Sequence, residues 1–111
     1  MKKLVLRFRA GDRAVFNAIK DGTKTVETRA ATVRYRGAGV GDIFVMVCGM
    51  ERLEKQIIAV RHFNNVNELL EVIDWKKIAP QADSKETLMA DYRRWYGAKI
   101  DQAGLVAFEL A

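Results

Sequence analysis

The sequence predicts a mixed α/β (α+β) domain, built as a five- to six-stranded, mostly antiparallel β-barrel with flanking helices. Two observations lead to this prediction. Several short runs alternate apolar and polar residues, and three longer segments repeat apolar residues at helical spacing, with turn and capping residues between them. The chain has 111 residues, 50% of them hydrophobic, and shows no repeat or linker, so we expect one domain over residues 1–111.

The expected strands are short alternating or β-branched runs bounded by turn residues. They cover residues 2–9, 23–29, 42–48, 53–63 and 105–110. Only four residues separate the third run from the fourth, so these two strands are expected to form a hairpin.

Helices are expected at residues 12–21, 66–73 and 84–96, where apolar side chains form one stripe. Side chains that can cap the first turns are Asp12, Asn65, and Asp83 or Ser84. Gly22 and Gly97 follow the first and last of these helices, where glycine commonly ends a helix.

Aromatic residues concentrate on one stripe of the last expected helix. Tyr92, Trp95 and Tyr96 recur there at helical spacing, which predicts that Trp95 belongs to the core. Tyr92 and Tyr96 each carry a hydroxyl that needs a hydrogen-bond partner when buried.

The net charge of +5 is unevenly distributed along the chain. Residues 1–61 contain 13 Lys and Arg against 6 Asp and Glu (+7), whereas residues 62–111 contain 6 against 8 (−2). Such an asymmetry favours an anionic partner such as RNA or a nucleotide phosphate, although a solvated basic surface would give the same count.

Cys48 is the single cysteine and lies in an apolar run, so we expect a buried, inert thiol in a reducing, cytoplasmic setting. With one cysteine and one histidine, His62, a tetrahedral His/Cys metal site is not expected. No cofactor, membrane-spanning segment or obligate protein partner is expected either.

The densest chemistry lies in Gly22-Thr23-Lys24-Thr25-Val26-Glu27-Thr28-Arg29. As a strand, residues 23–29 would place Thr25, Glu27 and Arg29 on one face and Lys24 on the other. A lysine desolvated in a cleft can act as a base, and a nearby carboxylate can position water. Thr25 or Thr28 could supply a hydroxyl, and Arg29 could stabilise an oxyanion. The alternative is a structural ion-pair cluster on a barrel rim.

Residues 30–41 are expected to form a loop without helical or strand period. Arg34 and Arg36 flank Tyr35 there, a pattern that could grip a nucleic-acid backbone with a base stacked on the ring, or simply be a solvated loop. The glycines that follow precede a strand rather than a helix, which argues against a dinucleotide site.

The motif Gly22-x-Lys24-x-x-Glu27-x-Arg29 resembles the GxKxxExR signature of ASCH domains, which are small PUA-like β-barrels. The resemblance continues in order through Gly41-Asp42, the Tyr-rich segment at residues 91–96 and the final run at 104–108. It implies a PUA-like barrel with a cleft that is lined by the motif and binds RNA or nucleosides. It also implies that the Tyr-rich segment packs near this cleft.

Some small stand-alone ASCH members are amidohydrolases that remove acyl groups from N4 of cytidine with a Lys, a Thr and a Glu. Lys24 matches that lysine, Glu27 stands where those enzymes have threonine, and their distal glutamate aligns only loosely, near residues 81–83. The resemblance therefore implies Lys24, Glu27 and Thr25 as catalytic residues. The substrate-binding residues would be Arg29, Thr28, Arg9, Tyr92 and Tyr96.

Other members of the family are ribonucleases or RNA-binding modules within larger proteins. Because this chain is a single domain, the sequence favours a small metal-independent amidohydrolase acting on a modified pyrimidine nucleoside. A non-catalytic RNA-binding module that uses Arg34, Tyr35 and Arg36 is the alternative, and the +7 half favours it.

Overall fold

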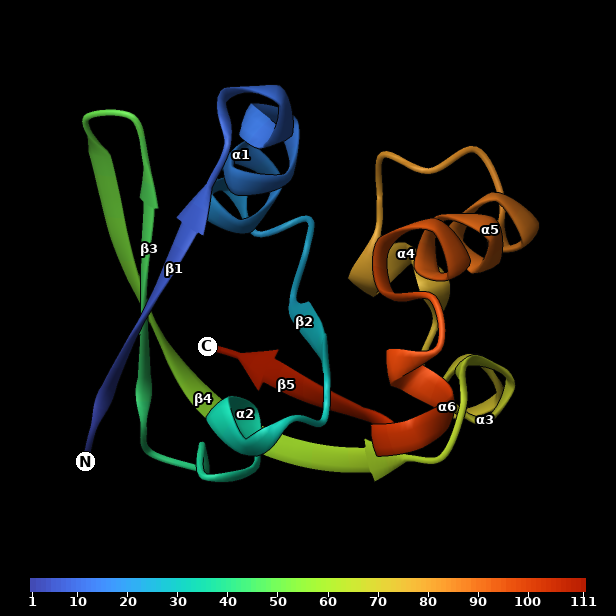
Figure 1. The fold of residues 1–111 in the computed structure, drawn as a ribbon. Helices are drawn as coiled ribbons and strands as arrows, with labels where there is room; N and C mark the ends of the chain where they lie inside the picture. Colours follow the sequence, from blue (N-terminus) through green and yellow to red (C-terminus); the bar gives the residue numbers. More distant parts are fainter.

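The computed structural model describes all 111 residues as a mixed α+β fold, in which helices flank a curled, five-stranded half-barrel sheet (Figure 1). The strands are β1 (Lys3–Phe8), β2 (Val26–Ala30), β3 (Ile43–Cys48), β4 (Glu51–Phe63) and β5 (Leu105–Leu110). The helices are the 3₁₀ turn η1 (Ala10–Asp12), α1 (Arg13–Asp21), α2 (Val33–Arg36), α3 (Val66–Val72), α4 (Trp75–Ile78), α5 (Lys85–Tyr96) and α6 (Lys99–Ala103).

The sheet has the strand order β1-β3-β4-β5-β2, so β1 and β2 are its two edges. The β1–β3 pair is parallel and the other three pairs are antiparallel, which confirms a mostly antiparallel sheet of five strands. The sheet curls into a half-barrel, which is consistent with the barrel-like fold that the sequence predicted. β1 and β2 are not paired with each other, and the chain between them forms η1 and α1.

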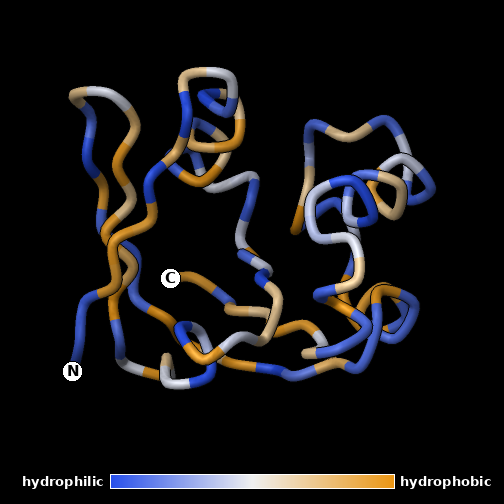
Figure 2. The backbone as a smooth tube through the Cα atoms, viewed as in Figure 1, coloured by the Kyte–Doolittle hydropathy of each residue, from blue (hydrophilic) through white to orange (hydrophobic).

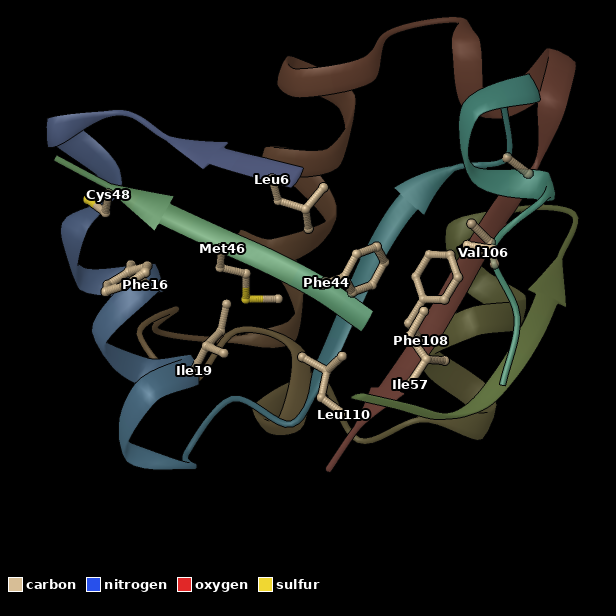
Figure 3. Close-up of a cluster of buried hydrophobic side chains, with 12 residues drawn as sticks. Leu6, Phe16, Ile19, Phe44, Met46, Cys48, Ile57, Val106, Phe108 and Leu110 are labelled. Carbon is tan, nitrogen blue, oxygen red and sulfur yellow. The ribbon is translucent and has the colours of Figure 1, made fainter. Parts of the chain in front are cut away.

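Two hydrophobic clusters lie on opposite faces of β5. Val106, Phe108 and Leu110 belong to the cluster inside the half-barrel (Figure 3), whereas Leu105 and Ala107 pack against the helical side. Successive side chains of a strand point to opposite faces, so β5 is buried on both. This explains why it is almost uniformly hydrophobic (Figure 2).

The long helices follow their sequence signals closely. Asn65 and Ser84 accept hydrogen bonds from the first turns of α3 and α5, as expected of N-caps. Gly22 ends α1 with a φ of +86°. Asp12 makes no capping hydrogen bond, because it closes the 3₁₀ turn that leads into α1.

The structure contains three short helices that the sequence did not predict. α2, α4 and α6 have four or five residues each, which is too few for an apolar period to be recognised. One of them corrects the expected loop at residues 30–41, since Arg34, Tyr35 and Arg36 lie on α2.

Candidate functional site

An open cleft of about 510 Å³ runs along the free edge of β2. The end of β1, the start of α1, and helices α4 and α5 form its other walls. Its charged, polar and aromatic lining residues are Arg7, Phe8, Arg9, Asp12, Lys24, Glu27, Thr28, Arg29, Gln81, Tyr92, Arg94, Trp95 and Tyr96. The cleft therefore lies where the half-barrel fails to close, and helices cover one of its sides.

Lys24 reaches the cleft floor from the segment between α1 and β2. β2 begins at Val26 and not at residue 23 as expected, so the strand alternation does not apply to Lys24. Its amine donates to the carbonyl oxygens of Val26 at 2.8 Å and Ile78 at 2.5 Å, and lies 3.6 Å from a carboxylate oxygen of Glu27. Lys24 and Glu27 thus meet, although the predicted strand placed them on opposite faces.

Lys24 is only 5% exposed. Burial lowers the pKa of its ammonium group, while the Glu27 carboxylate pulls the pKa in the opposite direction. Its three contacts match the three N–H donors of an ammonium ion. The geometry therefore describes a protonated lysine that ties β2 to the end of α4.

Glu27 is 6% exposed and carries the negative charge of the floor. Oε1 accepts from the backbone N–H of Thr28 at 3.0 Å, and Oε2 lies 3.5 Å from Nη2 of Arg29. Burial alone would raise the pKa of Glu27, but Lys24, Arg29 and the Thr28 N–H outweigh it and lower the pKa below its usual value. Glu27 is therefore an ionised carboxylate next to open space.

Arg29 is the third charged residue of the cleft floor, after Lys24 and Glu27, and it pairs with Glu27. Burial opposes its charged form, but the Glu27 carboxylate raises the pKa of Arg29 above its usual value. Its guanidinium carbon lies 5.6 Å from the centre of the Tyr35 ring. Its Nε is buried and has no hydrogen-bond partner. A buried donor without a partner is rare, and this one belongs to a residue that lines the cleft.

The hydroxyl groups of Thr28 and Tyr92 share a short hydrogen bond at the wall formed by α5. Tyr92 is almost fully buried, and burial raises its pKa. Tyr96 stacks on Tyr92, with ring centres 6.1 Å apart, and is half-buried; burial raises its pKa as well. Both tyrosines line the cleft, as does Arg9 at the end of β1. The structure thus brings these residues together with Thr28 and Arg29 around one cleft.

Thr25 does not line the cleft, although the sequence offered it as a catalytic hydroxyl. Its backbone N–H donates to the carbonyl oxygen of Lys77, and its carbonyl oxygen accepts from the N–H of Leu110. Thr28 is the threonine that the structure places beside Glu27. The sequence could not choose between them, because the choice depends on where the strand begins.

Trp95, Arg94 and Gln81 also line the cleft, and sequence reasoning missed them as site residues. Trp95 corrects the prediction of a core position, because its exposed fraction is 52%. Its ring meets the edge of Tyr92 at 5.9 Å between centres, which leaves much of the indole open. Only part of the aromatic stripe of α5 is covered: Tyr92 is buried, whereas Trp95 on the same stripe reaches the rim of the cleft.

Arg34, Tyr35 and Arg36 do not line the cleft. Arg34 donates to the carbonyl oxygen of Val5, and Arg36 donates to that of Ala31. Tyr35 is half-buried and contacts both Arg29 and Arg34. The two arginines that the sequence grouped together therefore point to different surroundings.

His62 is exposed on β4, and Cys48 is buried. No three His, Cys, Asp or Glu side chains gather closely enough to hold a metal ion. The longest helix, α5, has 12 residues, and none of the helices has the length and hydropathy that a membrane crossing requires.

Fold and site together define a small α+β protein with a basic cleft at the open edge of a half-barrel sheet. Two solved structures share this fold over nearly the whole chain. The crystal structure of hypothetical protein PH0355 has a TM-score of 0.83 at 24% identity and covers 99% of this chain and 97% of its own. The solution NMR structure of protein PF0455 from Pyrococcus furiosus has a TM-score of 0.78 at 26% identity and covers 97% and 94%.

No protein-family model matches the chain, and no curated protein matches it either. The two likenesses show the fold.

Proposed function

We propose that this chain is a PUA-like, ASCH-type amidohydrolase that removes the acyl group from N4-acylated cytidine in the cleft along β2. The observation that carries the proposal is the pair of Lys24 and Glu27. These side chains are 5% and 6% exposed, lie 3.6 Å apart and still border open space. Buried, oppositely charged groups with shifted pKa values in a cleft are typical of catalytic sites.

The cleft suits a nucleoside in size and character. Its volume of about 510 Å³ lies within the usual range of small-molecule sites. Trp95 and Tyr96 offer aromatic surfaces on which a pyrimidine ring can stack, and the charged groups gather at the floor by β2. The acyl amide would then face Glu27 and Arg29.

In the proposed reaction, Glu27 accepts a proton from a water molecule as the water oxygen attacks the acyl carbonyl carbon. The carbonyl oxygen becomes an oxyanion, for which the guanidinium group of Arg29, a residue that lines the cleft, is a suitable donor. Collapse of this intermediate breaks the C–N bond. Glu27 returns the proton to N4, so the products are cytidine and the carboxylic acid.

Lys24 has a supporting part in this mechanism. Its N–H groups are directed to two carbonyl oxygens and to Glu27, so the lysine is poorly placed to accept a proton. Its charge instead keeps Glu27 ionised and fixes the carboxylate at the floor. Thr28, bonded to Tyr92, holds the neighbouring wall in place.

The first prediction is that the purified protein converts N4-acetylcytidine to cytidine, measured by chromatography. Glu27→Gln should lower kcat by about 10²–10⁴-fold, the usual contribution of a positioned proton-transfer group. Lys24→Met should lower it as well, and Lys24→Arg should retain part of the activity because the charge remains. Glu71→Gln and Lys85→Met change exposed side chains outside the cleft and serve as matched controls. Circular dichroism confirms that each variant is folded.

A non-catalytic RNA-binding module is the second candidate. Two arginines of the cleft favour it. Arg7 and Arg9 line the cleft and form no ion pair within the protein, so both are available to phosphate groups of RNA. If no N4-acyl cytidine is hydrolysed while single-stranded RNA binds with an affinity that falls steeply with salt, the protein is an RNA-binding module and not an amidohydrolase.

A further inference from the structure

A second pocket adjoins the cleft and has no part in the proposed hydrolysis. It has a volume of about 290 Å³ and is lined by Val5, Leu6, Arg7, Arg29, Arg34 and Tyr35. We call it the β1–α2 pocket. Arg7 and Arg29 line both spaces, so the pocket and the cleft are neighbours. We propose that the β1–α2 pocket binds a phosphate group of the ligand whose base lies in the cleft, which makes the ligand a nucleotide unit and not a free nucleoside.

The charges of the pocket favour an anion. Three of its six lining residues are arginines, and none is acidic. Arg7 and Arg34 take part in none of the ion pairs of the protein, and Arg29 shares only one oxygen of Glu27 at 3.5 Å. Two guanidinium groups are therefore without a carboxylate partner at one small pocket. Phosphate oxygens are the anionic partners that guanidinium geometry fits well.

The arginines are also held in place before any ligand binds. One nitrogen of Arg34 donates to the carbonyl oxygen of Val5, and its guanidinium carbon lies 5.3 Å from the centre of the Tyr35 ring. Arg29 contacts the same ring at 5.6 Å. Because only one of the five N–H donors of Arg34 is used, the others can reach a ligand without reorganising the side chain.

The backbone of β1 adds donors to the same wall. The N–H of Ile43 donates to Lys2, and the parallel register pairs Lys3 with Ile43, so alternate residues of β1 bond to β3. Val5 and Arg7 therefore direct their backbone N–H groups toward the open edge, where no strand pairs with them. The bond from Arg34 to the Val5 carbonyl agrees with this direction. Backbone N–H groups beside guanidinium groups are common phosphate ligands.

This inference rests on the proposed function for the position of the base and goes beyond it in the ligand class. A free nucleoside is neutral and could form no ion pair with the two arginines next to its site. A nucleotide gains charge-assisted hydrogen bonds there. Arg7 and Arg29, which border both spaces, would lie between base and phosphate.

The test compares the binding of four unacylated ligands by calorimetry, so that no turnover interferes: cytidine, cytidine 5′-monophosphate, cytidine 3′-monophosphate and a cytidine trinucleotide. At least one phosphorylated ligand should bind about tenfold more tightly than cytidine, the effect of a charged hydrogen bond. A preference limited to one monophosphate identifies a free nucleotide as the ligand, and a further gain with the trinucleotide identifies RNA. Equal binding of cytidine and the phosphorylated ligands, or no measurable binding of these, overturns the proposal.

Arg34→Gln and Arg36→Gln form a matched pair, because both remove one charge from the short helix α2. Only Arg34 lines the pocket, whereas Arg36 donates to Ala31 and lines neither space. Arg34→Gln should abolish the preference for phosphate, and Arg36→Gln should retain most of it. Arg7→Gln, which removes no hydrogen bond or ion pair within the protein, should also reduce the preference. An equal loss in Arg34→Gln and Arg36→Gln would assign the effect to long-range charge and contradict a specific pocket.

The same protein samples separate the two proposals. Phosphate preference without hydrolysis of any N4-acyl cytidine would leave the β1–α2 pocket standing and remove the amidohydrolase. Hydrolysis without a preference for phosphorylated ligands would support the amidohydrolase and remove the phosphate site in the β1–α2 pocket.

Discussion

The chemistry of the cleft floor depends on the protonation states of two residues, Glu27 and Lys24. Glu27 is ionised because two cations and a backbone N–H surround it, although burial works against its charge. Burial lowers the pKa of Lys24, while its two carbonyl acceptors and its ion pair with Glu27 favour the ammonium form. Each charge is tolerated only in the presence of the other, since an unpaired buried charge is costly.

This coupling predicts a specific pH dependence of stability. The pKa of Glu27 in the folded protein lies below its usual 4.5, so the native state binds fewer protons in acid than the unfolded chain does. Its stabilisation is complete above pH 4.5 and is lost as the pH falls through the lowered pKa. At pH 7, Glu27→Gln should lower the free energy of unfolding by about 3 to 5 kcal/mol.

Urea unfolding between pH 3 and 7 measures this effect. The difference between the wild type and Glu27→Gln should shrink toward pH 3, since below pH 4.5 the unfolded chain takes up a proton at Glu27 and the advantage of the charged carboxylate in the folded state decreases. Glu71→Gln, at an exposed position without an ion pair, serves as the control. A difference that does not change with pH would show that Glu27 does not stabilise the fold through its charge.

At the scale of elements, the joints between helices and strands place the site. α1 ends at Gly22, and the chain passes Lys24 before it enters β2, which lets the lysine turn back to Val26. At the other end of the sheet, Gly104 joins α6 to β5 with a φ of +75° and a ψ of −170°. Non-glycine residues rarely adopt this conformation.

The joint at Gly104 should not accept a side chain. A Cβ atom there would lie 2.6 Å from the carbonyl oxygen of Phe63, which is backbone and cannot move aside easily. Gly104→Ala should therefore destabilise the protein by about 1–3 kcal/mol, the cost of such a conformation, before the clash is added. Thermal unfolding measures the loss.

Gly39→Ala is the matched control, because a Cβ at Gly39 would meet no atom within 4 Å and its φ is not positive. Its unfolding temperature should stay close to that of the wild type. A tolerated Gly104→Ala would mean that the α6–β5 joint can rearrange.

The whole molecule consists of a half-barrel and a helical layer that share β5 and β2 (Figure 1). At both free edges of the sheet, side chains bind backbone groups that no neighbouring strand pairs with. Arg34 binds the carbonyl of Val5 on β1, and on β2 Lys24 and Glu27 bind the carbonyl of Val26 and the N–H of Thr28. Lys24 also binds Ile78, so it joins the half-barrel to the helical layer.

Removing Lys24 should therefore loosen one part of the molecule more than the rest. Lys24→Met leaves Glu27 less compensated and frees the carbonyl of Ile78, so unfolding should become easier by about 3 to 5 kcal/mol. Hydrogen exchange should quicken first around α4. The double variant Lys24→Met/Glu27→Gln should lose less than the sum of the two single variants. Additive losses would contradict a coupled pair.

The sequence by itself determined the elements whose signals are local. Alternation, helical stripes and the caps Asn65 and Ser84 predicted all five strands and the three long helices. They also marked Lys24, Glu27, Thr28 and Arg29 as the polar centre of the chain, and these four line the cleft. Such signals suffice because capping and periodicity depend on residues only a few positions apart.

The tertiary structure alone decided which of these residues meet and which spaces they border. Thr28 rather than Thr25 enters the cleft, Trp95 reaches its rim, and Arg34 separates from Arg36. Each outcome depends on where a strand begins or on which side of a helix is covered. Contacts between segments distant in the sequence determine the start of the strand and the covered side of the helix. The open seam between β1 and β2 holds the cleft and the second pocket. It follows from the strand order of the sheet, which is set by pairing between segments distant in the sequence and is therefore contained in no local pattern.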